Sequence, residues 1–219
     1  MTIQEFHDTI RTLMNPGQGT FFNPEEIDRC LLLAINNLFT QQFKHFEETQ
    51  QITDELGFFK ADNANSPALV TGGYCNIPDD CYYITNLEAV MSDNSVVFLD
   101  LITDGAWTRR KNSSGFPPSK DYPICRKTGS RLQVLPVVSS GVIGVAKVNI
   151  FYLRKPATPK YNYTEVDGYG FAYQDSGSVQ VDYPEPTHPL IIEKALGYLG
   201  VPSGNNTLVS LEKIKAGSQ

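Results

Sequence analysis

The sequence lacks several features that would place it in a common functional class. It has no uninterrupted apolar run of about 20 residues, the length that a membrane-spanning helix needs. Its 219 residues include only three histidines and four cysteines, and neither type has the spacing of a zinc site. No Gly-x-x-x-x-Gly-Lys-Ser/Thr loop is present to cradle phosphates. We therefore expect no membrane contact, no metal and no cofactor.

Candidate catalytic groups are also scarce. His7, His45 and His188 form no paired motif, and the sequence has no Gly-x-Ser-x-Gly turn for a nucleophile. His188 lies between prolines, where we expect it to cap a helix or to lie on its surface. Asp79 and Asp80 follow a proline, which is typical of a turn; a carboxylate pair for glycoside hydrolysis is the alternative. We expect a protein without enzymatic activity and without catalytic residues.

The cysteines and the first residues both bear on where the chain folds. We expect reduced thiols, with a disulfide between Cys75 and Cys81 as the alternative; the other two cysteines are Cys30 and Cys125. The opening MTIQEFHDTIRTLMN has neither a basic start nor a long apolar stretch, so we expect no signal peptide. Folding in a cytoplasm fits both features.

Acidic residues outnumber basic ones, and the excess is uneven. The formal net charge is −6, and residues 1–56 hold nine acidic residues against three basic ones. Residues 57–185 are nearly balanced, with thirteen acidic and twelve basic residues. This distribution argues against a protein that grips DNA phosphates over a broad face. It is compatible with a surface past which DNA slides.

Two helices are expected near the N-terminus. Thr2 and Glu5 form a capping box for a short helix that ends at 15-NPG-17. A longer helix starts with an asparagine cap, a proline and an acid that completes a second box: Asn23, Pro24 and Glu26. Its apolar face comprises Ile27, Leu31, Ala34, Ile35, Leu38 and Phe39. The pattern extends through Phe43 and Phe46 to about residue 50.

Residues 57–185 change to short β-branched and aromatic runs broken by Gly, Pro, Asn and Asp. They predict six or seven strands in an antiparallel β-sandwich or small barrel. The run 145-VAKVNIFYLRKP-156 alternates, with Val145, Lys147, Asn149 and Phe151 on one face and Ala146, Val148, Ile150 and Tyr152 on the other. Long loops are expected at 104–123 and at about 156–177.

A helix returns after the proline-rich segment in 183-YPEPTHPLIIEKALGYLGV-201. We expect it to span residues 189–199, with an apolar face formed by Leu190, Ile191, Ala195, Leu196 and Leu199. Packed against the helix at 24–47, it would close a helical bundle begun at the other end of the chain. The expected fold is α+β: a discontinuous helical part (1–56 and 186–219) and a β-rich insertion (57–185).

A basic triplet, Arg109 to Lys111, follows the single tryptophan inside the first long loop. It could contact nucleic acid or an acidic neighbour, or form a solvated loop tip. Trp and Arg are common interface anchors. The residues expected at subunit or partner interfaces are Trp107, Arg109, Arg110, Lys111, Phe116, Tyr122, Val201, Leu208, Val209, Leu211 and Ile214. The segment from about residue 201 is expected to order on a partner.

This layout resembles the tailed-phage head-to-tail connector proteins of the tail tubular protein A family. The resemblance rests on 25-EEIDRCLLLAINNLFTQQF-43, 147-KVNIFYLRKPATP-159 and 184-PEPTHPLIIEKALGYLGV-201. The segment 107-WTRRKNSSGFPPSKDYPI-124 is similar to virion structural proteins of the crAss-like, short-tailed phages. The loop around residues 107–123 is longer than in the simplest members of the family.

The resemblance implies an adaptor ring, typically of twelve subunits, beneath the portal at the head–tail junction of the virion. Such a ring would be assembled in the host cytoplasm, contact the portal protein and a neighbouring tail or ring protein, and extend the DNA channel without sequence-specific binding. We expect acidic residues to face that channel: Glu25, Glu26, Asp28, Glu47 and Glu48. Their neutralisation should slow DNA passage, and truncation after Gly200 should abolish portal binding.

Other readings of the sequence exist. A tail-completion protein, or a virion protein that binds a receptor or glycan through Trp107 and nearby tyrosines, is the main alternative to the ring. A hydrolase built on a β fold is the third reading.

Overall fold

The computed structural model describes residues 1–14, 22–46, 48, 54–64, 67–166 and 170–201. Helices and several mostly antiparallel sheets occur together, so the predicted α+β class is confirmed. The chain divides into two compact units: Met1–Phe58 with Pro156–Gln219, and Phe59–Lys155. The β-rich insertion was expected to end at residue 185, but residues 156–185 group with the first unit. Contacts to its long helix explain this, because Tyr161 and Tyr183 hydrogen-bond to that helix.

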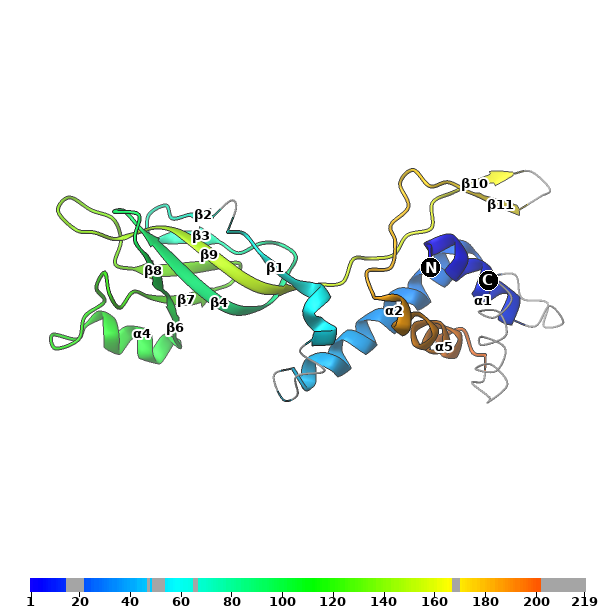
Figure 1. Cartoon of the computed structure of the whole chain (residues 1–219), viewed down its shortest axis with the longest axis horizontal. Helices are drawn as coiled ribbons and strands as arrows, with labels where there is room; N and C mark the ends of the chain where they lie inside the picture. Colours follow the sequence, from blue (N-terminus) through cyan, green and yellow to red (C-terminus); the bar gives the residue numbers. More distant parts are fainter. Residues whose placement is uncertain (15–21, 47, 49–53, 65–66, 167–169, 202–219) are drawn as a thin grey trace. The chain divides into compact units, whose positions relative to one another are not determined.

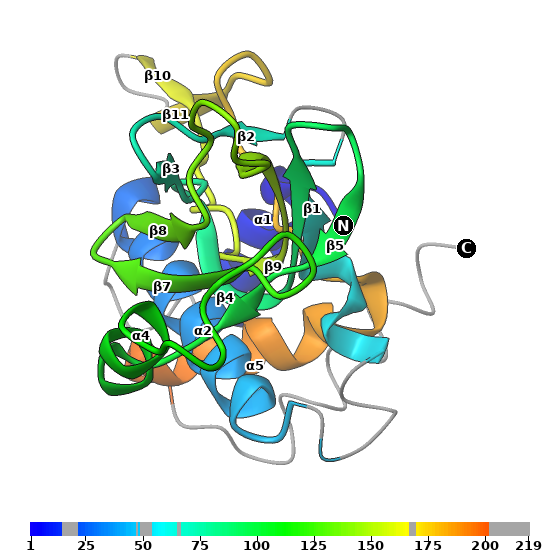
Figure 2. The ribbon, with the colours of Figure 1, turned by 90° about the vertical axis from the view of Figure 1, so that its left-hand side faces the viewer.

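The first unit contains α-helices from both ends of the chain, among them α1 (Ile3–Leu13), α2 (Pro24–Lys44) and α5 (His188–Tyr198). Both predicted capping boxes are present, with Thr2 and Asn23 as the capping residues. Helix α5 packs against α2 and also contacts α1, and the ribbon shows α2 and α5 side by side (Figures 1 and 2).

The apolar face predicted for α2 is confirmed, since all six of its members are buried. The helix ends at Lys44, earlier than the predicted residue 50. Its C-cap, His45, turns its backbone N–H to the carbonyls of Gln42 and Phe43, which tightens the last turn. The acidic side chains of its first turn suit the positive end of the helix dipole.

The apolar face of α5 differs from the prediction by part of a turn. The buried residues are His188, Ile191, Ile192, Ala195 and Leu196, whereas the predicted Leu190 is 40% exposed. His188 lies in the interior, 4% exposed, and its Nε2 donates to the Tyr183 carbonyl at 2.7 Å. The expectation that His188 caps the helix or lies on its surface was therefore wrong. Thr187 is the N-cap residue, and the bond to Tyr183 allows the polar ring of His188 to be buried.

The remainder of the first unit holds more regular structure than predicted. Strands β10 (Tyr163–Val166) and β11 (Gly170–Tyr173) form an antiparallel hairpin within the segment expected to be a loop. The β-branched run 178-SVQVDYP-184, which we also expected to form one of the strands, contributes only a bridge between Lys160 and Val179. It leads into a short 3-10 turn, η3 (Glu185–Thr187).

The second unit follows the 3-10 turn η2 (Leu56–Phe59) and begins with an open, five-stranded antiparallel sheet. Its order is β1-β9-β4-β5, and β2 pairs with β9 on the same edge as β1. The strands are β1 (Lys60–Asp62), β2 (Ala68–Leu69), β4 (Cys81–Met91), β5 (Val96–Phe98) and β9 (Val145–Arg154). The sheet has free edges, so the small-barrel alternative was wrong.

The second sheet has the order β3-β8-β7-β6. Its strands are β3 (Tyr74–Asn76), β6 (Asp100–Leu101), β7 (Ile124–Thr128) and β8 (Arg131–Leu135). Strands β6 and β7 pair in parallel, which departs from the antiparallel pairing predicted throughout. A connection of this kind needs a crossover, and helix α4 (Asp104–Lys111) lies within it.

Alternation along β9 is confirmed from Val148 to Tyr152 but fails at both ends, since Leu153, next to Tyr152, is fully buried as well. Val148, Ile150 and Tyr152 are buried, as period-2 spacing predicts. Val145 was assigned to the opposite face but is fully buried. A register shift at Val90/Met91, where Met91 pairs with Val145, reverses the inward and outward positions there.

One apolar core joins the inward faces of both sheets of the second unit. Its buried members come from β3, β4, β7, β8 and β9 and from adjoining residues: Cys75, Ile77, Leu87, Ala89, Met91, Leu99, Cys125, Leu132, Val134, Val145, Val148, Ile150 and Tyr152. This core belongs to residues 59–155 alone. In the described part of the chain, none of the helices combines the length and apolar character needed to cross a bilayer.

Candidate functional site

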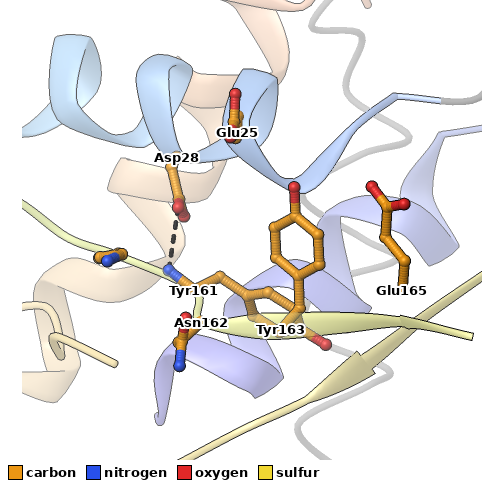
Figure 3. A pocket seen from close by; sticks show the side chains of 7 residues that line it. Glu25, Asp28, Tyr161, Asn162, Tyr163 and Glu165 are labelled. Atoms are coloured by element: carbon orange, nitrogen blue, oxygen red, sulfur yellow. Dashed lines mark hydrogen bonds between the residues drawn. The ribbon is translucent and has the colours of Figure 1, made fainter. Parts of the chain in front are cut away.

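The first unit contains an open pocket beside the N-terminal end of α2, with a volume of about 530 Å³. We call it the acidic pocket; it is lined by Glu25, Asp28, Lys160, Tyr161, Asn162, Tyr163 and Glu165. Figure 3 shows Asp28 of α2 directed at the Tyr161 backbone, with Glu25 farther along the same helix and Tyr163 and Glu165 on β10. Three acidic residues and one lysine make the pocket negative in sum.

Asp28 fixes the geometry of this pocket by joining three segments. One carboxylate oxygen accepts from His7 Nε2 at 2.8 Å, and the other accepts from the Tyr161 backbone N–H at 2.9 Å. The His7 ring, which is fully buried, stacks on the Tyr161 ring with centroids 4.2 Å apart. The Asp28 side chain is only 16% exposed. This predicted channel-facing acid therefore ties α1, α2 and the approach to β10 together.

Aromatic rings form the wall opposite Asp28. Tyr161 is 4% exposed and contacts the ring of Tyr173 at 5.0 Å, while Tyr163 meets Phe171 edge-on at 4.8 Å. The pKa of Tyr163 is raised, first by desolvation and then by the negative charges of Glu25, Glu165 and Asp28. A ring face in such a negative setting is suited to hold a cation.

The other predicted channel-facing acids have different surroundings. Glu26 completes the capping box, where its carboxylate accepts from the Asn23 N–H at 3.1 Å. Glu48 lies 2.7 Å from His45 Nδ1. Glu25 is exposed and borders the acidic pocket. Glu47 lies outside the described residues.

Trp107, predicted as an interface anchor, is a core residue of the second unit. It is 4% exposed, and the Arg126 guanidinium lies over its ring at 5.1 Å. The predicted loop at 104–123 begins with helix α4, which starts at the N-cap Thr103 and carries Trp107 on its inner side. The prediction missed this helix because Ala106 and Trp107, its two apolar residues, are adjacent and give no helical periodicity.

The basic triplet occupies the last turn of α4, and we call Arg109, Arg110 and Lys111 the basic tip. Arg109 and Lys111 are exposed. The Arg110 guanidinium lies 4.1 Å from the ring centroid of Phe116, whose own ring contacts Tyr122 at 5.2 Å. Cations at a helix C-terminus are favoured by its dipole, so this placement costs the fold little.

Phe116 and Tyr122 are 47% and 57% exposed, and they extend the surface of the basic tip with apolar area. Val201, another predicted contact residue, is half-buried at the end of the first unit. The remaining predicted contact residues lie outside the described part of the chain: Leu208, Val209, Leu211 and Ile214.

The structure also bears on the reactivity of the cysteine thiols and on possible metal ligands. All four cysteines are free, so the Cys75–Cys81 disulfide is not formed. Burial raises the pKa of the Cys75 thiol to about 11, and it also raises the pKa of Cys125. Such thiols stay protonated and unreactive near neutral pH. Within the described ranges, no three His, Cys, Asp or Glu side chains gather closely enough to hold a metal ion.

The glycine-containing run 141-GVIGVAK-147 has a packing role. A Cβ on Gly144 would lie 2.3 Å from the backbone of Val137 and Val138, so only glycine fits there. Comparison with protein-family models and with curated proteins found no match to this sequence.

Five of the seven residues that line the acidic pocket were not predicted. Lys160, Tyr161, Asn162, Tyr163 and Glu165 lie in a segment that was predicted only as a loop. The alternation of tyrosines in 161-YNYTEV-166 and the aromatic 170-GFAY-173 are the signals that could have indicated a hairpin.

Proposed function

We propose that the protein is a non-enzymatic virion structural protein that forms a ring at the portal–tail junction, extends the DNA channel and seats the tail. The supporting observation is that each subunit consists of two dissimilar compact units. One unit is built from both ends of the chain and carries the acidic pocket; the other is an uninterrupted segment that carries the basic tip. A closed ring joins one surface of a subunit to a different surface of the next, and this chain offers such a pair.

In this proposal helices α1, α2 and α5 of the first unit act as a bundle, and the two sheets of the second unit act as a β-sandwich around their shared core. Packing of α5 on α2 supports the bundle. The sandwich is supported by the apolar core of the second unit, which contains residues from both sheets. The bundle would supply the acidic surface past which DNA moves, since like charge repels the phosphates within a Debye length of about 8–10 Å.

Glu48 is the predicted channel-facing acid best suited to a test, because its side chain is 62% exposed and it does not line the acidic pocket. Asp28 and Glu26 also hold the fold together, so their neutralisation would perturb more than a channel wall. Replacing Glu48 with Gln is therefore the cleaner test of DNA passage. Slower ejection is expected, and unchanged ejection would contradict an acidic channel wall.

A virion protein that binds a receptor or glycan is the competing candidate. Burial of Trp107 removes the ring that was expected to stack on a sugar. The exposed Phe116 and Tyr122 are the aromatic residues near the basic tip that could still do so.

Native mass measurement, alone and with the portal protein of the same virus, tests the ring. We expect a species that becomes a twelve-fold assembly on the portal, visible by electron microscopy. Portal alone and chain alone are the controls. A stable trimer, or a monomer indifferent to the portal, would overturn the ring and favour the glycan-binding candidate, which a glycan array would then examine.

A further inference from the structure

The ring proposed above requires two surfaces that recognise each other, and the structure carries a complementary pair. We propose that the basic tip of one copy enters the acidic pocket of the neighbouring copy. The occupant of the pocket is thus a second copy of this chain. This inference rests on the proposed ring and specifies the contact that closes it.

The first argument is that the acidic pocket and the basic tip carry exposed charges of opposite sign. Glu25 and Glu165 are exposed at the pocket and form no ion pair with another described residue. Arg109 and Lys111 are likewise exposed and without an ion pair in the described part of the chain. Unpaired charges of opposite sign on the two units would steer copies together and fix their register.

The second argument is the shape and chemistry of the pocket, which go beyond a group of carboxylates. A hollow of about 530 Å³ lies within the range of pockets that bind small groups. Tyr163 borders it between two carboxylates, and Asp28 holds the neighbouring Tyr161 in place. An arginine that enters such a site can pair with a carboxylate and lie over an aromatic face, which few other side chains can do.

The third argument concerns Arg110 at the basic tip. Its Nε is buried against the protein without a hydrogen-bond partner, while its guanidinium stacks on Phe116. The stack leaves the guanidinium pre-oriented, so less side-chain entropy is lost when the tip binds. Phe116 and Tyr122 beside it supply apolar area that a contact would bury.

Charge reversal on one surface at a time tests the acidic pocket and the basic tip independently. The pocket variant is Glu25→Lys with Glu165→Lys, and the tip variant is Arg109→Glu with Lys111→Glu. All four positions are exposed, and neither variant touches the Asp28 network or the Arg110 stack. Asp8→Lys on α1 and Lys127→Glu on β7 are exposed control reversals, one in each unit.

Assembly of the full chain on the portal is measured by native mass and by sedimentation. Each variant alone is expected to need at least about tenfold more protein for half-assembly than wild type, since like charges then meet. An equimolar mixture of the two variants should restore assembly, because each reversed pocket meets a reversed tip on the next copy. The controls should assemble as wild type does.

The outcomes distinguish this contact from the ring itself. If wild type forms rings and both variants do so equally well, the contact is wrong while the ring stands. If each variant fails but the mixture also fails, the tip does not enter a neighbour's pocket, and the inference is overturned. If wild type forms no ring on the portal, the ring is overturned and the contact with it. Circular dichroism melting of each variant confirms that it is folded.

Discussion

At the scale of single residues, Asp28 has the widest structural consequences in the first unit. Substitution Asp28→Ala would leave the buried His7 Nε2 and the Tyr161 N–H without an acceptor. Each unsatisfied buried group costs about 1–3 kcal/mol, so we expect a loss of about 2–4 kcal/mol in the free energy of unfolding. Denaturant unfolding followed by circular dichroism measures it.

Glu165→Ala is the matched control, because this carboxylate lines the same pocket but is exposed. It should change the free energy of unfolding by no more than about 0.5 kcal/mol. Equal effects of the two substitutions would contradict the role of Asp28 as the link between segments.

Trp107 offers a second prediction at the residue scale. Because its side chain is buried, Trp107→Ala should destabilise the second unit by about 3–5 kcal/mol, through lost burial and an unfilled cavity. Thermal melting of the variant is the measurement, with the exposed Arg109→Ala as control. A variant that melts like wild type, yet assembles poorly, would restore Trp107 to the interface role that the sequence suggested.

At the scale of elements, an ion pair links the β4–β5 turn to the segment after α4. Asp93 accepts from the Lys120 ammonium and from Ser95, and these bonds hold the pKa of Asp93 well below its usual value. The same pairing raises the pKa of Lys120. The pKa of Asp93 is lower in the folded chain than in the unfolded chain, where it is about 4. The ion pair therefore stabilises the folded state at pH values above about 4, and this stabilisation is lost as the pH falls through the pKa of the folded chain.

The segment around Tyr122 should therefore keep its position from pH 8 to about pH 5, and it should loosen only in stronger acid than a free aspartate would predict. Nuclear magnetic resonance titration of the Asp93 carboxyl and of the nearby amides measures this. Asp93→Asn should remove the transition. A carboxyl that titrates at its ordinary pKa would show that the ion pair does not persist in solution.

The elements also show which structure the sequence could predict. Helices α1 and α2 were correctly located because their caps and their apolar spacing are local signals. Helix α4 was missed because its stability comes from one buried tryptophan and a threonine cap, which are tertiary and short-range features without a period. Val145 was misassigned because a register shift depends on the partner strand.

The candidate site was predictable in part for the same reason. Glu25 and the basic tip are visible in the sequence as charges at helix ends. Lys160 to Glu165 reach the pocket through contacts to α1 and α2, such as the bond from Tyr161 to Asp28, which joins residues 133 positions apart. Pairings of that separation leave no mark in a single sequence.

At the scale of the whole molecule, residues 59–155 contain a complete core of their own. We expect this segment, expressed alone, to fold cooperatively, as domains with their own core do. A single sigmoidal denaturation curve and dispersed amide resonances would verify it. The control is the same segment with Leu132→Asp, which should be unfolded because it places a charge in the core. A wild-type segment that lacks cooperative unfolding would contradict independent folding.

The way in which this segment enters and leaves its sheet has a consequence for evolution and engineering. Lys60 at its start pairs with Leu153 near its end on neighbouring strands. Paired residues on antiparallel strands lie only about 5 Å apart, so the chain enters and leaves the second unit at neighbouring positions. A short turn, or another domain whose ends lie close together, could therefore replace the residues between Lys60 and Leu153. We therefore expect the second unit to tolerate changes in length and surface, because only two closely spaced strand ends join it to the rest of the chain.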